Sequence, residues 1–222
     1  MMNHPTPLFI DEVQKETSIL EEIKIAVDRS EERENFLLSG SSKLLLMKGV
    51  SEPTIKAWIS ILERTGIIYL LQPYSSSSLH RSIRSPKICF RDTGLACYLT
   101  RWLTSDALRN SAAAGKMFET FVVSEIFKSY SNEGKEYSFS VFYYRGKDKG
   151  TESKIDLIIE ENGILYPVEI KMTGNPKAIM AKANLVLDKI KDKQKGVGVI
   201  LCLVENKTYL RENLVALPIE YI

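Results

Sequence analysis

Histidine and cysteine are scarce in this chain, and each scarcity excludes a kind of site. Only two histidines occur, His4 and His80, so a histidine-based zinc site is not expected. The three cysteines are Cys89, Cys97 and Cys202, and no two of them form a C-x-x-C pair. Scattered cysteines of this kind are typical of reduced thiols, so we expect a cytoplasmic protein.

Long apolar runs and a strong net charge are also absent. No run approaches the roughly 20 residues that a membrane span needs, and the N-terminus lacks the pattern of a signal peptide, so we expect no membrane partner. The net charge of +2 does not by itself indicate nucleic-acid binding; only a local basic cluster could do so. The 222 residues, 44% hydrophobic and 26% charged, predict a soluble globular protein of one or two domains.

The stretch K-I-D-L-I-I-E-E-N-G-I-L-Y-P-V-E-I-K predicts two strands joined by a tight turn. Ile155–Ile159 is rich in β-branched residues, as a buried strand is. Glu161–Gly163 supplies the turn, because an Asn-Gly pair can take positive φ. Ile164–Met172 is the predicted return strand.

Three charged residues of this hairpin form a candidate catalytic site. Glu169 and Lys171 are two residues apart, so they point to the same face, and Asp156 on the partner strand can lie beside Glu169. Two carboxylates can hold a hard cation such as Mg²⁺, and a lysine beside them can orient a water for attack on a phosphodiester. Asp156 and Glu169 are therefore the predicted metal ligands. The alternative is a solvated strand face that carries a Glu–Lys pair.

The spacing of Asp156 from Glu169-Ile170-Lys171 resembles the PD-(D/E)xK nuclease superfamily, although Ile155 stands in place of the proline. The predicted helix 115–130 carries Glu119 within an apolar surface, where an unpaired charge would be costly. Its best partner would be the cation or Lys171. The first core helix of the superfamily often supplies such a glutamate, so the resemblance makes Glu119 a fourth catalytic candidate. The alternative is a glutamate that reaches solvent.

The elements around this hairpin follow the order helix, three strands, helix, strand. This αβββαβ order is that of the restriction-endonuclease-like fold, so we expect an α/β domain of that class. The apolar patterns predict the remaining elements as a strand at 140–145, a charged loop at 146–153, a helix at 176–193, a buried central strand at 197–204 and an edge strand at 216–222.

The N-terminal residues resemble part of an AAA-type ATPase core. Residues 7–14 predict a strand that ends in Asp11-Glu12, which looks like a Walker B motif, where the Asp holds the Mg²⁺ of ATP and the Glu positions water. A helix at 18–29 and a second strand at 35–41 follow, as in the sensor strand of these ATPases. The alternative is an ordinary strand followed by a helix cap.

The phosphate-binding loop of such an ATPase has no match in this sequence. No stretch reads G-x-x-x-x-G-K-[ST], so no backbone nest or lysine is available to cradle the phosphates. We therefore interpret residues 1–48 as a remnant of an ATPase core, fused to the rest by deletion, and expect that ATP is not a cofactor.

Residues 49–92 predict a winged-helix-like segment. A helix that Ser51 caps and Gly66 ends is followed by the strand Ile67–Leu71, and the wing would close at 86–91. A basic cluster in this segment could contact nucleic-acid phosphates; its members are Arg81, Arg84, Lys87 and Arg91. The alternative is a solvated loop, or a segment that packs between modules.

Residues 49–222 closely resemble the C-terminal half of prokaryotic AAA-type ATPases that carry domain of unknown function 4143. The resemblance rests on the stretches G-V-S-E-P-T-I-K-A-W, F-R-D-T-G-L-A, M-F-E-T-F-V-V-S-E, K-I-D-L-I-I-E and P-V-E-I-K. It implies a winged helix and then, over residues 93–222, a nuclease-like domain. The implied catalytic site comprises Glu119, Asp156, Glu169 and Lys171.

Two functions remain open from the sequence. The first is a module that binds nucleic acid or a protein partner through a nuclease-like fold, without ATPase activity. The second is a Mg²⁺-dependent nuclease that cleaves DNA or RNA.

Overall fold

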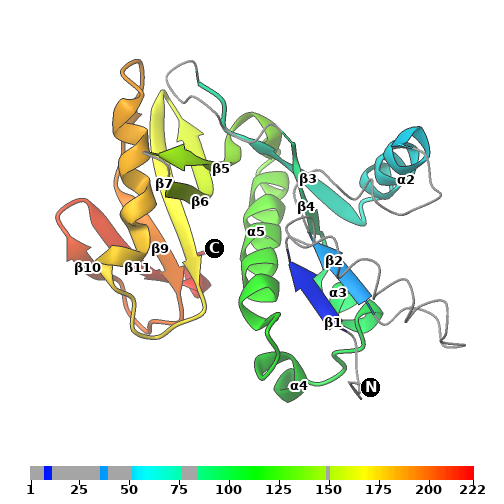
Figure 1. Ribbon diagram of the computed structural model, residues 1–222. Coiled ribbons are helices and arrows are strands. Elements are labelled where there is room, and N and C mark those ends of the chain that lie inside the picture. The colour runs from blue at the N-terminus through cyan, green and yellow to red at the C-terminus, as the bar shows by residue number, and fades with distance from the viewer. Residues whose placement is uncertain (1–7, 12–35, 40–51, 77–84, 149–150) are drawn as a thin grey trace, which may run out of the picture. The chain divides into compact units, whose positions relative to one another are not determined.

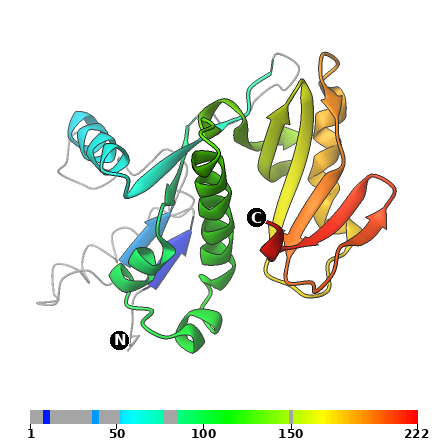
Figure 2. The same cartoon turned by 180° about the vertical axis from the view of Figure 1, so that it is seen from behind.

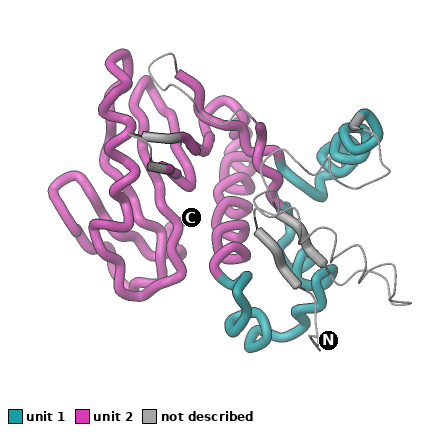
Figure 3. The backbone as a smooth tube through the Cα atoms, in the orientation of Figure 1, with its two compact units in different colours: residues 1–69, 90–114 teal, residues 70–89, 115–222 magenta. Residues whose placement is uncertain are grey.

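The computed structural model of this chain describes residues 8–11, 36–39, 52–76, 85–148 and 151–222 (Figure 1). The chain divides into two compact units, one made of residues 1–69 and 90–114 and the other of residues 70–89 and 115–222 (Figure 3). The fold is mixed α/β, as predicted, and its main feature is a nine-stranded mixed sheet.

In its described residues, the first unit contains a two-stranded parallel sheet and three helices. Strands β1 (Leu8–Asp11) and β2 (Phe36–Ser39) pair in parallel, which agrees with the two strands predicted for this region. The helices are α2 (Glu52–Arg64), α3 (Thr93–Leu99) and α4 (Ser105–Arg109). The predicted helix at 18–29 and the predicted Ser51 cap lie outside the described residues.

Gly66 ends α2 by a backbone conformation that favours glycine, as the sequence predicted. Its φ is +71°, and its N–H donates to the carbonyl of Glu63 over 3.0 Å. The N–H of Ile67 donates to the carbonyl of Leu62 over 2.9 Å. This pair of bonds is a Schellman motif, which satisfies the last carbonyls of the helix and turns the chain into the next strand.

The nine-stranded sheet lies mainly in the second unit. Its strand order is β10-β11-β9-β7-β6-β5-β3-β4, and β8 pairs with β7. The strands are β3 (Ile68–Pro73), β4 (Lys87–Phe90), β5 (Val141–Asp148), β6 (Thr151–Glu161), β7 (Ile164–Lys171), β8 (Gln194–Lys195), β9 (Gly198–Cys202), β10 (Thr208–Arg211) and β11 (Leu214–Pro218). Pairs β5–β6 and β6–β7 are antiparallel, whereas β9 runs parallel to both β7 and β11.

Helix α5 (Ala114–Asn132) and three 3₁₀ helices complete the structure: η3 (Tyr137–Phe139), η4 (Ala178–Lys189) and η5 (Ile219–Tyr221). The order α5, β5, β6, β7, η4, β9 is the predicted one. Helix η4 lies along one face of the sheet, and both views show it beside β7 and β9 (Figure 1 and Figure 2). Its buried side chains join Tyr144, Ile155, Ile158 and Leu165 of the strands in one apolar cluster.

The helix predicted at 176–193 is not an α-helix. Residues 178–189 form a 3₁₀ helix that is interrupted at Ala181, where ψ is 19°. Ala181, Asn184, Leu187 and Ile190 are buried at a spacing of three residues, which matches the three residues per turn of a 3₁₀ helix. The apolar side chains therefore reach the sheet with the tighter repeat.

Two other expectations for the sheet were wrong. Residues 146–153 belong mostly to a long β ribbon, because β5 runs to Asp148 and β6 begins at Thr151. The strand predicted at the sheet edge, β11, lies between β9 and β10. Pro218 is the last residue of β11, where the missing N–H is tolerated, and β10 takes the edge position instead.

Candidate functional site

The β6–β7 hairpin positions the predicted charged residues. Its turn has Asn162 at φ 52° and Gly163 at φ 76°, the two positive values that a type I′ turn requires. The paired positions run from Glu161 opposite Ile164 to Leu157 opposite Val168. One further step in this register sets Asp156 opposite Glu169, and directly opposed residues of antiparallel strands share a face.

Lys171 joins the two carboxylates of the hairpin. Its Nζ lies 2.8 Å from Asp156 Oδ2 and 2.8 Å from Glu169 Oε2. The same Asp156 oxygen accepts a 3.0 Å hydrogen bond from the backbone N–H of Ile170. The structure thus brings together the three residues that the sequence grouped on one face.

Glu119 of α5 reaches the same cluster, through lysines rather than through direct contact with the hairpin carboxylates. Lys154 Nζ lies 2.8 Å from Asp156 Oδ1 and 3.4 Å from Glu119 Oε1. Lys87 forms an ion pair with Glu119, and Lys116 Nζ lies 3.7 Å from Glu119 Oε2. These three lysines, with Lys171, complete what we call the lysine–carboxylate cluster.

Sequence reasoning missed two members of this cluster and assigned a third to another role. Lys154 is two residues before Asp156, so strand alternation alone places both on one face of β6. Lys116 is one helical turn before Glu119. Lys87 was predicted to contact nucleic acid from the wing; its ammonium group pairs with Glu119, and the nucleic-acid contact stays a prediction.

The carboxylates are buried and the ammonium groups are partly exposed. The side chains of Asp156 and Glu169 are each 4% exposed and that of Glu119 is 9% exposed, whereas the four lysine side chains range from 27% to 38%. The four lysine side chains are therefore more exposed than the three carboxylates with which they pair.

The surrounding charges move the pKa values of the carboxyl groups in different directions. Burial opposes ionisation of Asp156, but Lys154, Lys171 and the Ile170 N–H outweigh it and hold the pKa well below its ordinary value. Burial also opposes ionisation of Glu119, yet Lys87 and the other lysines lower its pKa. Burial and the neighbouring Asp156 charge raise the pKa of Glu169 to about 8.

The donor groups of Asp156 and Glu169 fit a hard divalent cation, with water supplying the remaining ligands. Glu169 Oε1 is buried and has no hydrogen-bond partner, so one carboxylate oxygen is left for such an ion. Within the described ranges, no three His, Cys, Asp or Glu side chains gather into a metal-binding group. Any cation here would rest on the two hairpin carboxylates.

Cys89 lies close enough to the cluster to sense its charges, but it is a poor nucleophile. Burial raises the pKa of its thiol to about 11, so the thiolate is scarce at neutral pH. All three cysteines carry free thiols, as predicted.

The structure describes only some of the other predicted contact residues. Glu12, Arg81 and Arg84 lie outside the described residues, and only the backbone of Asp11, the last residue of β1, is described. The guanidinium of Arg91 lies over the ring of Tyr69, 4.9 Å from its centroid. A common basic face formed by the four predicted residues therefore stays a prediction.

Comparison with known families gives a domain-level identity. Residues 114–222 match the domain of unknown function 4143, residues 38–106 match the domain of unknown function 8612, and residues 1–62 match an AAA domain. The C-terminal part of this chain is a domain of unknown function 4143. The family resemblance of the sequence is thereby confirmed, and the lysine–carboxylate cluster lies mainly within this 4143 domain, with Lys87 outside it.

The individual relatives are distant and do not name an activity. Uncharacterised proteins of Mycobacterium tuberculosis and Mycobacterium bovis are each 27% identical over 189 residues, which is 84% of this chain. The chain spans 39% of the length of these relatives. A crystallised protein from Vibrio cholerae aligns over 78% of this chain and 40% of its own, with a TM-score of 0.33 and 15% identity, too low to assign a fold.

None of the helices in the described part of the chain has the length and apolar character of a membrane span.

Proposed function

We propose that the 4143 domain of this chain is a nucleic-acid-binding module built on a nuclease-like fold. The observation that carries the proposal is the lysine–carboxylate cluster, in which four partly exposed ammonium groups cover three buried carboxylates. Phosphate groups are the ligands that such a surface favours, because ammonium groups that bind them release condensed counterions. The buried carboxylates hold the lysines in place.

The element order supports the nuclease-like assignment. Helix α5, strands β5 to β7, η4 and β9 follow the αβββαβ order, and Asp156, Glu169 and Lys171 stand at the D…ExK positions. The segment of α2, β3 and β4 before them supports a winged helix, a fold that can add phosphate contacts or bind a protein partner. The absence of a phosphate-binding loop from this sequence supports a role that needs no ATP hydrolysis by this chain.

Lys116 provides the least disruptive test of phosphate binding, because its 3.7 Å ion pair is the longest in the cluster. Lys116→Gln is expected to weaken binding of single-stranded DNA, duplex DNA or RNA and to reduce the slope of log K against log salt by about 0.9. Fluorescence anisotropy over a salt series measures both quantities.

Lys135→Gln is the matched control for this experiment. Lys135 pairs with Glu133 on the surface, and both side chains are more than half exposed. The control should bind as the wild-type chain does. Equal binding by Lys116→Gln and the wild type at every salt concentration would contradict phosphate contact at the cluster.

A second candidate function, a Mg²⁺-dependent nuclease, is favoured by the unpartnered Oε1 of Glu169. In that reaction Asp156 and Glu169 would hold the cation, which supplies charge neutralisation and an acidified water. Lys171, which contacts both carboxylates, would position that water beside the scissile phosphate. Glu119 would hold Lys154 against Asp156 and so support the site from α5.

Asp156→Asn separates the two functions because it has opposite effects on them. The substitution removes one negative charge from a phosphate-binding surface, so nucleic-acid binding should be unchanged or tighter. Cleavage requires the carboxylate as a metal ligand, and loss of one such group typically lowers the rate by orders of magnitude.

The measurement pairs anisotropy with a cleavage assay on plasmid, single-stranded DNA and RNA in Mg²⁺ or Mn²⁺. Metal-dependent cleavage by the wild type that Asp156→Asn abolishes would establish the nuclease. Binding without cleavage by either protein would leave the binding module as the function. If the wild type showed no binding and no cleavage, both proposed functions would be refuted.

A further inference from the structure

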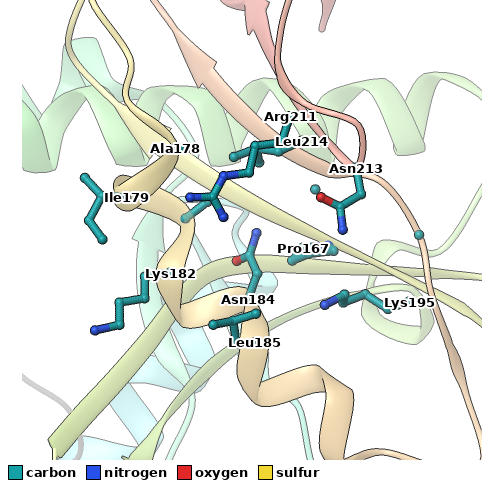
Figure 4. A pocket seen from close by; sticks show the side chains of 13 residues that line it. Pro167, Ala178, Ile179, Lys182, Asn184, Leu185, Lys195, Arg211, Asn213 and Leu214 are labelled. Carbon is teal, nitrogen blue, oxygen red and sulfur yellow. The ribbon is translucent and has the colours of Figure 1, made fainter.

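A small cavity of about 130 Å³ lies in the second unit, away from the residues of the lysine–carboxylate cluster. Its walls come from η4, from β8 and the start of β9, and from the β10–β11 turn (Figure 4). The cavity is several times larger than a single water requires but smaller than the roughly 300 Å³ at the lower end of pockets for drug-sized ligands. Its size suits a small polar group.

The charged side chains of this cavity are all basic. Lys182, Lys195 and Arg211 line it, and no Asp or Glu does. Lys195 forms an ion pair with Asp188, whereas Lys182 and Arg211 have no ion-pair partner among the residues that the structure describes. A metal cation is therefore excluded on charge, and an anion is favoured.

Asn184 gives the cavity a polar floor with an unused acceptor. The residue is 7% exposed, and its Oδ1 is buried without a hydrogen-bond partner. A buried acceptor of this kind costs free energy unless a donor reaches it. The Asn184 amide packs closely against β9. A Cβ added at Gly198 would lie only 2.9 Å from Asn184 Nδ2. Glycine at this position keeps that space open.

The polar groups converge from three separate elements. Figure 4 shows the guanidinium of Arg211, the amides of Asn184 and Asn213 and the ammonium of Lys195 directed toward the middle of the cavity. The ammonium of Lys182 points outward at the rim. Donors from separate elements therefore surround the space.

We propose that this cavity binds a terminal phosphate group, such as inorganic phosphate or the phosphate of a monoester. The phosphate oxygens would accept from Arg211, Lys195 and the two side-chain amides. A guanidinium matches two oxygens of one phosphate, which favours phosphate over chloride. The proposal is independent of the function proposed for the lysine–carboxylate cluster.

Amide NMR of the whole chain, without divalent metal and at constant ionic strength, tests the proposal. Titration with inorganic phosphate should shift the side-chain NH₂ signals of Asn184 and Asn213 and the backbone amide of Gly198 along saturable curves. Arg211→Gln should weaken this binding by about tenfold or more, because a hydrogen bond to a charged group is lost. Arg211 is exposed at the rim, so the substitution should leave the fold intact.

Two further variants make the result specific. Asn184→Asp has nearly the same shape but places a negative charge in the cavity, so it should abolish phosphate binding. Lys191→Gln removes one positive charge from an exposed position that does not line the cavity, and it should bind phosphate as the wild type does. If the amide spectrum of Asn184→Asp is no longer dispersed, the variant has not folded. The comparison of Arg211→Gln with Lys191→Gln then decides whether the cavity binds phosphate.

Titrations with adenosine monophosphate, and with short DNA that has either a 5′-phosphate or a 5′-hydroxyl end, distinguish a free phosphate ligand from a nucleic-acid end. Equal affinity for phosphate and the monophosphate would indicate a free phosphate ligand, and tighter binding of 5′-phosphorylated DNA would indicate a nucleic-acid end. Equal shifts from 5′-hydroxyl DNA would overturn the requirement for a terminal phosphate group. Linear, unsaturated shifts with every ligand, or equal affinity in Arg211→Gln, would overturn the site.

Discussion

Replacement of Lys171 by methionine is expected to lower the free energy of unfolding by about 3 kcal/mol at pH 7, the cost of removing one partner from a buried ion pair. Lys171 contacts Asp156 and Glu169, and each of these residues is only 3% exposed. Methionine retains the apolar stem but leaves the buried Asp156 carboxylate with Lys154 as its only ammonium partner. Urea unfolding of both proteins measures the difference.

Lys135→Met is the matched control, because it removes the same group from an exposed pair with Glu133. Exposed ion pairs contribute between about 0 and 1 kcal/mol, so this variant should unfold close to the wild type. If both substitutions had the same small effect, the cluster would be an ordinary surface network. The double variant Lys171→Met with Glu169→Gln should recover part of the lost stability, because glutamine, unlike Glu169, takes up no proton when the chain folds at pH 7.

The core of the candidate site could be predicted because it depends on local rules. Strand alternation places Glu169 and Lys171 on one face, and the Asn162-Gly163 turn fixes the register that brings Asp156 opposite Glu169. A hairpin needs no information from distant parts of the chain. The sequence alone is therefore enough to group these three residues.

The lysines were harder to predict because their partners are distant in the sequence. Lys87 meets Glu119 across 32 positions, and Lys154 meets Glu119 across 35. A basic residue in a polar stretch is usually solvated, and sequence pattern alone does not show which one neutralises a buried carboxylate. Lys154 was missed as well, although its spacing of two residues from Asp156 places both on one face of the strand.

Prediction from the sequence was also incomplete for the sheet beyond the hairpin. The apolar run that became β9 was recognised as a buried central strand, because burial on both faces leaves no polar alternation to read. Strand β10 was missed, since Thr208–Arg211 is short and mostly exposed. Helix η4 was assigned the wrong helix type, because apolar spacings of three and four residues occur together in both α and 3₁₀ helices.

Glu169 is expected to make the stability of the chain fall as pH rises between about 4.5 and 8. Burial and Asp156 raise its pKa from the ordinary value of 4.5 to about 8, so in this range the folded chain keeps a proton that the unfolded chain releases. The unfolded state then binds fewer protons, and the free energy of unfolding decreases with pH. Asp156 affects stability in a different pH range. Its pKa is lowered in the folded chain, so the stability that it contributes is lost only as pH falls below about 3.8.

Glu169→Gln isolates this effect because glutamine resembles the protonated carboxyl group. At pH 5 the variant and the wild type should have similar stability, and by pH 8 the variant should be more stable by roughly 3.5 kcal/mol, since each unit of pKa difference corresponds to about 1.4 kcal/mol. Urea unfolding at several pH values from 5 to 8 measures the difference. Glu133→Gln, at an exposed position, should show a constant difference from the wild type. A constant difference for Glu169→Gln as well would mean that Lys171 keeps Glu169 ionised throughout, and that the unpartnered Oε1 is tolerated by a carboxylate already neutralised by its lysine.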